Sequence, residues 1–350
     1  MARRAILLSP FWPLDYAMPE TLADRLKAHA RELGFCACGI AAAGPAKSTD
    51  RLEKWLSAGF EAGMGWMARP DAVAKRADLR TLWPEARSVV CVALHYRTQE
   101  PWDSETMGQI ARYARGKDYH DTLTARLKSL LSWLQTETPC QGKVYVDTGP
   151  ILEREWAQRA GLGWIGKNTL LMSREFGSYV LLGELLLDIE LPPDQPHLQD
   201  FCGTCTRCLD ACPTDAFVAP HVLDANRCIS YHTIENRKVA TIELREKFGD
   251  WVFGCDICQD VCPWNAKSAR NPAAYSPEPA LWSRPEMPAL TEWPSLSQSE
   301  FSRRLKGSPI KRTKRRGMRR NAARVMRNRR RQLIGSVHRP PKLTSPEKTI

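Results

Sequence analysis

Eight of the twelve cysteines in this 350-residue chain fall between positions 202 and 262, in two runs whose spacing suits iron–sulfur chemistry. The first run has the pattern C-x2-C-x2-C-x3-C-P, in which three thiolates bind one [4Fe–4S] cluster and the fourth binds a second cluster. The other run repeats the end of this pattern, but Val252 stands where its first cysteine would fall. The runs consist of Cys202, Cys205, Cys208 and Cys212, and of Cys255, Cys258 and Cys262.

Cys228 completes the ligand count. It is the only other cysteine between positions 202 and 262, so we expect it to replace the missing first cysteine of the second run. Because the last cysteine of each run crosses to the neighbouring cluster, two sets of four follow. The first set is Cys202, Cys205, Cys208 and Cys262; the second is Cys212, Cys228, Cys255 and Cys258.

Zinc and disulfides are the alternatives for these cysteines. Zinc sites normally pair two C-x2-C elements, whereas here a third cysteine follows at the same spacing and both runs end in Cys-Pro. Disulfides are typical of short secreted chains, and this is a long chain without a recognisable secretory signal. The sequence therefore predicts two [4Fe–4S] clusters.

Asp147 is the candidate for proton chemistry. It ends a short predicted strand and precedes the turn residues Gly149 and Pro150, at the strand end where sites form in α/β sheets. A partly buried aspartate with a raised pKa can supply the protons that a reductase must deliver with its electrons. A simple turn-initiating aspartate is the equal alternative.

Two further motifs carry less weight. The segment 161–166 matches G-x-G-x-x-G, but a predicted helix precedes it where a dinucleotide site requires a strand. Asp118 and His120 begin like the cobalamin motif D-x-H-x-x-G, but Leu123 replaces its glycine. His120 is therefore only a weak candidate for a cobalt ligand.

The net charge of +12 lies in one C-terminal segment. Between Arg303 and Arg331 there are 15 basic and no acidic residues, while the rest of the chain carries 36 basic and 39 acidic ones. Ser308 and Pro309 are typical of a helix start. We expect a basic helix that binds a nucleic-acid phosphate backbone, with an anionic membrane surface second and a disordered tail or solvated helix as alternatives. Its predicted apolar face is Met318, Ala322, Val325 and Met326.

The remaining pattern predicts an α+β region before the cysteines, with strands and helices in layers. No apolar run approaches the roughly 18 residues that span a bilayer. Arg3 and Arg4 begin like a twin-arginine signal, but too short an apolar stretch follows them, so we expect a cytoplasmic protein. Helices are predicted at 19–33, 49–58, 121–137 and 151–159, and strands at 88–95, 143–147 and 179–191.

Proline-rich stretches at 192–196 and 271–294 suggest the domain boundaries. We expect a catalytic domain and a two-cluster, ferredoxin-like domain, followed by a linker with a basic helical region and by a disordered tail. Their predicted limits are 1–195, 196–270, 271–335 and 336–350.

Together these features resemble the epoxyqueuosine reductase family over nearly the whole chain. The cysteine pattern alone is common to many proteins, but its combination with the other segments is specific. The matching segments are 113–120, 146–150, 161–169, 202–213, 228–231, 255–264 and 308–312.

The resemblance implies a cobalamin-dependent iron–sulfur oxidoreductase that removes the epoxide oxygen of epoxyqueuosine at the tRNA wobble position, the last step of queuosine synthesis. It implies a nitroreductase-like or flavin-reductase-like N-terminal domain that binds cobalamin. Its implied partners are tRNA with a modified anticodon wobble base and an external low-potential donor of the flavodoxin or ferredoxin type, with no membrane. Some members add helical HEAT-type repeats, whereas this sequence stops after about one pair of basic helices, so we expect a smaller contact with the tRNA body.

The resemblance also implies roles for single residues. Asp147 matches the proton donor of the family. Ser230, Asp256, His120 and Asn168 match positions expected near the corrin. Arg237 matches a position expected near tRNA, and the predicted basic helix adds Lys311, Arg312, Lys314 and Arg315. A reductive dehalogenase-like enzyme and a non-catalytic iron–sulfur carrier are the other classes considered.

Overall fold

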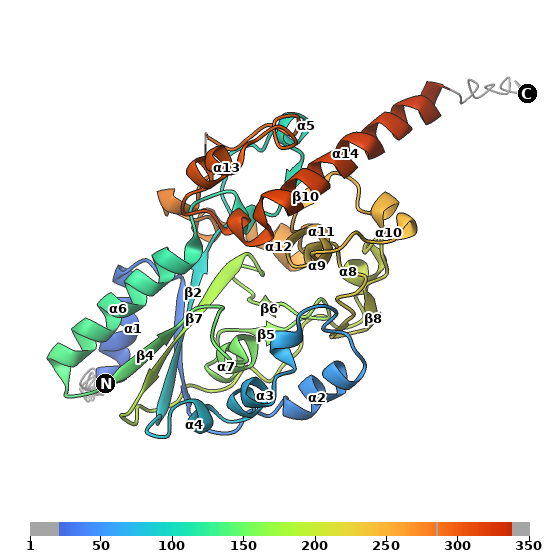
Figure 1. The fold of residues 1–350 in the computed structure, drawn as a ribbon. Helices are drawn as coiled ribbons and strands as arrows, with labels where there is room; N and C mark the ends of the chain where they lie inside the picture. The colour runs from blue at the N-terminus through green and yellow to red at the C-terminus, as the bar shows by residue number, and fades with distance from the viewer. Residues whose placement is uncertain (1–20, 285, 338–350) are drawn as a thin grey trace, which may run out of the picture.

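The computed structural model of the protein describes residues 21–284 and 286–337. At its centre lies a four-stranded antiparallel sheet of order β1-β2-β7-β4 (Figure 1). The predicted signal-like start and most of the predicted tail from position 336 fall outside the described residues. The strands are β1 Ala37–Ala42, β2 Ser88–His95, β7 Val180–Leu187 and β4 Gly142–Tyr145.

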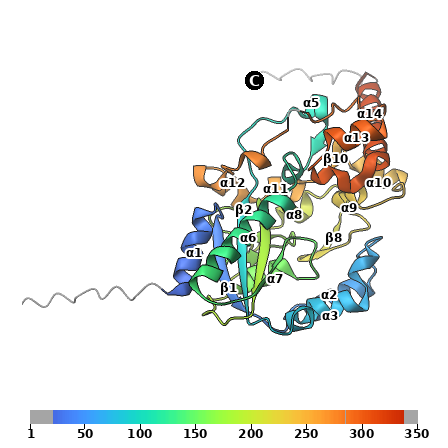
Figure 2. The ribbon, with the colours of Figure 1, turned by 60° about the vertical axis from the view of Figure 1, so that its left-hand side comes forward.

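Strand β2 is buried along its whole length because its apolar side chains pack on both faces of the sheet. Val90 and Val92 face one core, and Val89 and Cys91 face the other. Helices lie over both faces of the sheet, as Figures 1 and 2 show. These are α1 Leu22–Glu32 and α6 Tyr119–Glu137 on the first face, and α7 Glu153–Arg159 on the second.

This mixture of helices and antiparallel strands agrees with the predicted α+β class. Strand β1 escaped prediction because its sequence is rich in alanine and glycine, which favour strands weakly. An added Cβ at Gly39 would lie 2.0 Å from the backbone oxygen of Ala160, so only glycine lets the end of α7 approach the sheet. Helix α6 begins two residues earlier than predicted because the Asp118 side chain caps it by accepting from the His120 backbone N–H.

Shorter elements fill the rest of the N-terminal region. The G-x-G-x-x-G segment leads into the hairpin of β5 and β6, so it opens a strand and not the helix of a dinucleotide site. The elements are α2 Thr49–Ser57, η1 Gly65–Met67, α3 Pro70–Ala77, α4 Leu79–Leu82, α5 Ser104–Met107, β3 Gln109–Ile110, η2 Arg112–Ala114, β5 Trp164–Ile165 and β6 Leu171–Met172.

The cysteine region consists of short helices and strands joined by tight turns. It is followed by a C-terminal region that ends in one long helix. The elements are α8 Arg207–Asp210, β8 Phe217–Ala219, β9 Val222–Leu223, α9 Ile229–Ile234, α10 Ile242–Lys247, β10 Trp251–Phe253, α11 Ile257–Asp260, α12 Pro263–Ser268, η3 Pro272–Ala274, η4 Pro279–Leu281, α13 Gln298–Arg304, η5 Pro309–Thr313 and α14 Lys314–Val337.

A shared core joins the C-terminal region to the parts before it. Val252, which stands in place of a cysteine, is completely buried in this core with Ile110, Trp293 and Met318. Strand β10 also pairs in parallel with β3 of the N-terminal region. The predicted boundary at position 270 therefore separates no independent core, because residues on both sides of it pack together.

The basic helix differs from its prediction in its start and in the use of its arginines. Ser308 caps η5, and α14 begins at Lys314, whose backbone has φ of +64°. Met318, Ala322 and Val325 are completely buried, which confirms the apolar face. Several arginines that a solvated helix would expose instead donate to backbone carbonyls of the cluster region. They include Arg320, which bonds Asn236, Lys238 and His232, and Arg324, which bonds Trp251.

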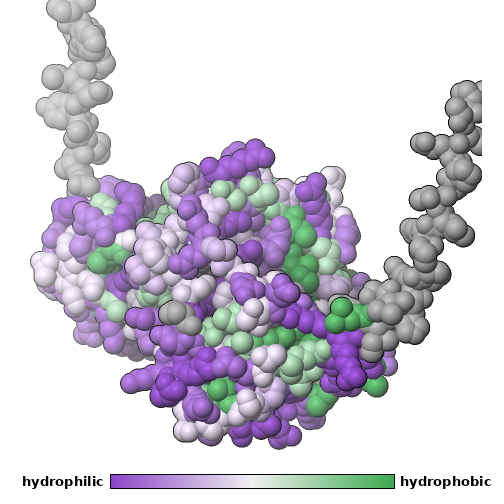
Figure 3. Space-filling view, turned by 90° about the horizontal axis from the view of Figure 1, so that it is seen from above, coloured by the Kyte–Doolittle hydropathy of each residue, from purple (hydrophilic) through white to green (hydrophobic). Residues whose placement is uncertain are grey.

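The face that carries these C-terminal elements is mostly hydrophilic, with smaller hydrophobic areas between (Figure 3). Within residues 21–284 and 286–337, no helix combines the length and the apolar composition that crossing a membrane requires.

Candidate active site and iron–sulfur centres

The seven thiols of the two runs and that of Cys228 lie in two neighbouring groups. Burial raises the pKa of Cys208 to about 11, with further contributions from the negative charges of Cys202, Cys262 and Cys205. Burial likewise raises the pKa of Cys255, with Cys228 and Cys212 as charged neighbours. In both cases the thiols that act on one another belong to one predicted set of four.

Helix starts and tight turns hold these thiols. Cys228 directly precedes α9, and the backbone N–H groups of Tyr231 and Ser230 point at its sulfur and favour the thiolate. Cys262 directly precedes α12, where Pro263 takes the first helical position. Ser230, predicted near the corrin, therefore also supports a cluster ligand through its backbone and its hydroxyl.

The donor set suits iron–sulfur clusters. Four half-buried thiols that raise one another's pKa become thiolates together only beside a strongly positive centre. No three His, Cys, Asp or Glu side chains of the described residues converge closely enough to hold a single metal ion.

Asp147 lies in the turn after β4 and is paired with a histidine from α6. Its backbone has φ of +55°, and its side chain is 58% exposed. His120 Nε2 lies 3.2 Å from Asp147 Oδ2, and His120 Nδ1 lies 2.6 Å from Asp118 Oδ1. Burial lowers the pKa of His120, but its hydrogen bonds to the two carboxylates outweigh burial and raise the pKa to about 9.

The protonation of this pair corrects the expectation for Asp147. Its pKa is lowered, not raised, because the hydrogen bond with His120 stabilises the carboxylate more than burial destabilises it. The hydroxyl of Tyr119 lies beside the same carboxylate. At neutral pH the available proton therefore resides on His120, directly next to Asp147.

Two residues predicted near the corrin tie the second thiol group to the N-terminal region. Asp256 is 1% exposed, and it accepts bonds from Arg112 at 2.8 Å (backbone N) and 3.2 Å (Nη1). Burial raises the pKa of Asp256 to about 6. Asn168 is buried and donates to the backbone oxygen of Cys258 at 3.4 Å.

Tyr113 links this region to Asp147. It is partly buried, and the negative charges of both Asp147 and Asp256 add to the effect of burial in raising its pKa. Asp147 and Asp256, the neighbour of Cys255, are therefore both close enough to Tyr113 for their charges to act on its hydroxyl. In the sequence Tyr113 belongs only to the matching segment 113–120, because nothing in its spacing predicts that it lies near Asp147 and Asp256.

Arg312 belongs to the Asp147 site as much as to the basic surface. Its Nε donates to Glu235 at 2.8 Å, and its guanidinium lies 5.2 Å from the ring centre of Trp66. The charge of Arg312 also contributes to the lowered pKa of Asp147. Arg237, expected near tRNA, donates to the backbone oxygen of Arg312 at 2.9 Å and so holds η5 in place.

The other basic residues expected at tRNA separate into two kinds. Lys311 and Lys314 are exposed. Arg315 is half-buried and donates to the backbone oxygen of Leu296 at 3.1 Å, which gives it a structural contact. Trp66, which is 42% exposed, was missed because a lone aromatic residue in a glycine-rich loop gives no pattern.

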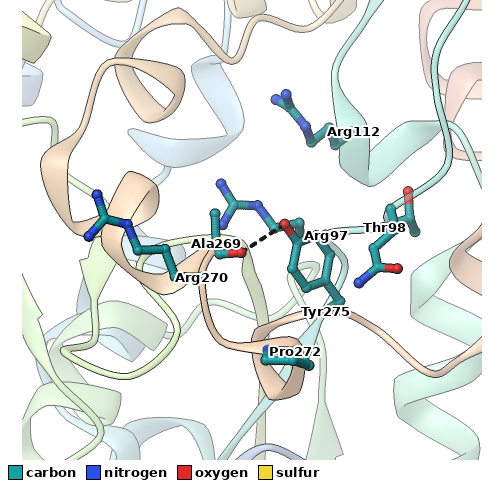
Figure 4. Close-up of a pocket in the computed structure, with 8 residues that line it drawn as sticks. Arg97, Thr98, Arg112, Ala269, Arg270, Pro272 and Tyr275 are labelled. Carbon is teal, nitrogen blue, oxygen red and sulfur yellow. Dashed lines mark hydrogen bonds between the residues drawn. The ribbon is translucent and has the colours of Figure 1, made fainter.

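Two cavities adjoin these residues. One of about 490 Å³ lies between α6 and the turn of Asp147, and His120 and Tyr145 are among its lining residues. The other, of about 390 Å³, has a strongly cationic lining that includes Arg97, Arg112 and Arg270, and Figure 4 shows the Tyr275 hydroxyl bonded to Ala269 beside it.

Comparisons with known proteins agree with both parts of this site. The family model described as "Epoxyqueuosine reductase QueG, DUF1730" matches residues 76–148, which include His120 and Asp147. The model described as "4Fe-4S double cluster binding domain" matches residues 201–265, which include all eight thiols.

Curated relatives and solved structures match most of the chain. The epoxyqueuosine reductase of Synechocystis sp. is 45% identical over 79% of this chain and 94% of its own length. That of Gloeobacter violaceus is 44% identical over 86% of this chain and 94% of its own. An epoxyqueuosine reductase crystallised with an epoxyqueuosine-modified tRNA-Tyr stem loop has 34% identity, a TM-score of 0.80, and coverage of 92% of this chain and 86% of that one.

A structure of the Bacillus subtilis epoxyqueuosine reductase, with its catalytic loop swung out of the active site, matches at a TM-score of 0.79. It is 33% identical, over 92% of this chain and 86% of that one.

Proposed function

The chain belongs to the epoxyqueuosine reductase family, and from this premise we propose that it reduces epoxyqueuosine to queuosine at the wobble position of tRNA. The main support is the combination of the paired His120 and Asp147 with two groups of thiols, in a fold shared with a relative that was crystallised with a modified tRNA stem loop. This is the final step of queuosine synthesis, and its tRNA substrate suits the cytoplasmic location expected from the sequence.

The double-cluster domain supports two [4Fe–4S] clusters. We infer that the first set of thiols receives electrons, because the neighbouring Gly203, Thr204 and Arg207 are exposed to an external donor. Cys208 and Cys258 influence each other across the two sets, so the second cluster is the natural next carrier. A donor of the flavodoxin or ferredoxin type fits the low potential of such clusters.

We also propose cobalamin as the cofactor, bound between Asp147 and the second cluster within a nitroreductase-like N-terminal domain. When bound, cobalamin supplies a strongly reducing cobalt centre that clusters can recharge with single electrons. The effect of both Asp147 and Asp256 on the pKa of Tyr113 supports this proposal, since it brings the proton site and the neighbour of Cys255 near one residue. Ser230, Asp256, Asn168 and His120 remain the proposed contacts.

The chain's own contribution to the chemistry is proton delivery. Removing the epoxide oxygen as water consumes two electrons and two protons. Asp118 orients the imidazole of His120 through Nδ1, and Nε2 keeps a proton next to Asp147. Asp147 thus remains the proposed donor to the leaving oxygen, with His120 as the residue that holds the proton for it.

For tRNA we propose a surface formed by Lys311, Arg312 and Lys314, with Arg237 supporting it. Exposed cations bind phosphates without reading sequence. Arg312 and the exposed ring of Trp66 lie at the entrance to Asp147, where an extruded wobble base must arrive. Arg315 has a backbone partner and is a weaker candidate than the sequence suggests.

The function is tested with protein reconstituted anaerobically with iron, sulfide and cobalamin, a low-potential reductant, and an anticodon stem loop that carries epoxyqueuosine. Mass spectrometry of the digested RNA should show queuosine and the loss of one oxygen. Unchanged epoxyqueuosine with fully loaded protein, under conditions in which the Bacillus subtilis enzyme converts it, overturns the proposal.

A further inference from the structure

A buried carboxyl group without a partner lies in the sheet beneath the Asp147 site. Glu184, in the middle of β7, is 0% exposed, and neither of its carboxyl oxygens has a hydrogen-bond partner among the described residues. Its cross-strand neighbours are Cys91 on β2 and Tyr145 on β4. A charged carboxylate at such a position costs several kcal/mol, so Glu184 is expected to carry a proton.

Glu153 connects Glu184 to the Asp147 turn. It begins α7, which packs against β7 on the face of the sheet that Glu184 shares with Leu186. Its Oε1 accepts the backbone N–H of Asp147 at 2.5 Å. Its carboxyl group is also the ionisable group with the largest influence on Glu184.

The charges around this pair favour an exchangeable proton. Burial raises the pKa of Glu153 to about 7, and the negative charge of Asp147 adds to it, while Arg154 and His120 act in the opposite direction. Burial raises the pKa of Glu184 well above its ordinary value, and Glu153 and Asp147 raise it further. Of the described groups that act on Glu184, none is positively charged.

A structural role does not account for Glu184. A side chain that only filled this core would be more stable without an unpaired polar group. Glu155, on the same helix as Glu153, shows the contrast: it is buried too, but accepts bonds from the backbone N–H groups of Lys47 and Ser48.

The proposed reaction consumes one more proton than the pair of His120 and Asp147 holds. Each turnover breaks the two carbon–oxygen bonds of the epoxide, forms the carbon–carbon double bond, and releases the oxygen as water. Two electrons come from the low-potential donor through the clusters, and two protons go to the oxygen. The pair of His120 and Asp147 holds one proton, so a second must reach Asp147 during turnover.

We propose that Glu184 and Glu153 form an internal proton store that reloads Asp147, so that the second proton of each turnover comes from within the protein. Glu184 gives its proton to the carboxylate of Glu153, Glu153 gives a proton to the carboxylate of Asp147 once the first proton has been used, and solvent then reprotonates Glu184. This proposal rests on the proposed function for its purpose, but the protonated Glu184 does not depend on it.

The first test measures protonation without turnover. Infrared difference spectra of the cluster-loaded protein at neutral pH, in water and in heavy water, should show the carbonyl stretch of a buried protonated carboxyl group. Glu184→Gln should remove this band, and Glu155→Gln should retain it. A wild-type protein without the band has an ionised Glu184, and this result overturns the proposal whether or not the protein reduces epoxyqueuosine.

The second test measures the pH dependence of turnover. Glu184→Gln and Glu153→Gln should each lower kcat by roughly tenfold or more on the alkaline side of pH 7, with KM for the stem loop unchanged, and should recover at lower pH where solvent supplies protons. Iron content and melting temperature establish that each variant is folded. A loss of equal size at every pH, as a packing defect would give, overturns the proposal.

Failure of the store and failure of the proposed function are distinguishable. If the wild-type protein leaves epoxyqueuosine unchanged, the function fails, while the infrared band still reports on Glu184. If the wild-type protein is active and Glu184→Gln keeps its full alkaline rate, the store fails alone.

Discussion

The two chemical regions of this protein are assembled in opposite ways. The eight thiols come from one stretch, residues 202–262, and their spacing along short turns and helices decides which of them meet. The proton site collects residues distant in sequence: His120 from α6, Arg312 from η5 and Glu184 from β7. A local pattern therefore suffices to predict a ligand set, whereas the state of a proton depends on partners that only the fold supplies.

The two regions also balance charge differently. The buried thiols act on one another as like charges and need an external cation to become thiolates together. Asp147 finds its counter-charge inside the protein, in His120. Substituting a cluster cysteine should therefore lower the metal content, whereas substituting Asp147 should slow proton transfer and leave the metal content unchanged.

The largest effect is expected for Cys212→Ala. The variant should lose the cluster of Cys228, Cys255 and Cys258, and with it all turnover, because electrons must pass through that cluster. Iron and acid-labile sulfide after anaerobic reconstitution should fall to roughly half of the wild-type content. Cys140→Ala, which changes a half-buried cysteine outside both runs, should retain both clusters.

The ligand assignment is open to a direct contradiction. Electron spin resonance of the reduced Cys212→Ala protein should show the signal of the first cluster. The Cys202→Ala protein should keep only the signal of the second cluster. If Cys212→Ala shows this same signal, Cys212 is a ligand of the first cluster and the assigned crossover is wrong.

Asp147→Asn should leave both clusters intact and reduce kcat by roughly 10²- to 10⁴-fold, the usual contribution of a general acid. The asparagine can still receive a hydrogen bond from His120 but cannot transfer its proton. Single-turnover rates at saturating reductant measure this loss. Asp121→Asn, on the exposed surface of the first turn of α6, is the matched control, and wild-type rates in both variants would reduce Asp147 to a turn residue.

Much of the secondary structure could be predicted from the local sequence. Strand β2 has the predicted limits, and the apolar face of α14 lies where its spacing places it. The hydrophobic period and the helix-capping residues are short-range signals, so one sequence is enough for them. The two sets of thiols are predicted for the same reason.

What could not be predicted depends on contacts across the fold. Asp147 was expected to have a raised pKa, but the partner that lowers it lies 27 positions away on α6. Arg320 and Arg324 looked like free cations, yet they bond carbonyls near β10. In each case the sequence gives the residue type, and the long-range partner decides what that residue does.

Substitutions in the basic segment 303–331 should have an effect of intermediate size, on tRNA binding. Replacing Lys311 and Lys314 together by serine should weaken binding of the stem loop and reduce the log–log salt slope by roughly 0.7 to 0.9 for each lost phosphate contact. The clusters and kcat should be unchanged, since both side chains are exposed and distant in sequence from the thiols. Titrations of labelled stem loop at several salt concentrations provide the slope.

An inward-facing arginine is the matched control for that double variant. Arg320→Gln removes a positive charge from the same basic segment, but one already bonded to backbone carbonyls of Asn236 and His232. It should lower the melting temperature and leave the salt slope unchanged. A slope that falls equally in both variants would show that RNA binding depends on the total charge of the segment and not on its exposed cations.

The smallest effect concerns stability and tests the proton of His120 itself. Because the pKa of His120 is raised to about 9 in the fold, its pairing with Asp118 and Asp147 stabilises the protein fully below the ordinary histidine pKa of about 6.5. That stabilisation is then lost as the pH rises through 9. His120→Gln should therefore differ most from wild-type in unfolding free energy near about pH 6 and least near about pH 10. His29→Gln, which removes an imidazole from α1, is the control. A difference that instead grows with pH would place a neutral His120 in the fold, and the site would need Asp147 itself to hold the proton, as the sequence first suggested.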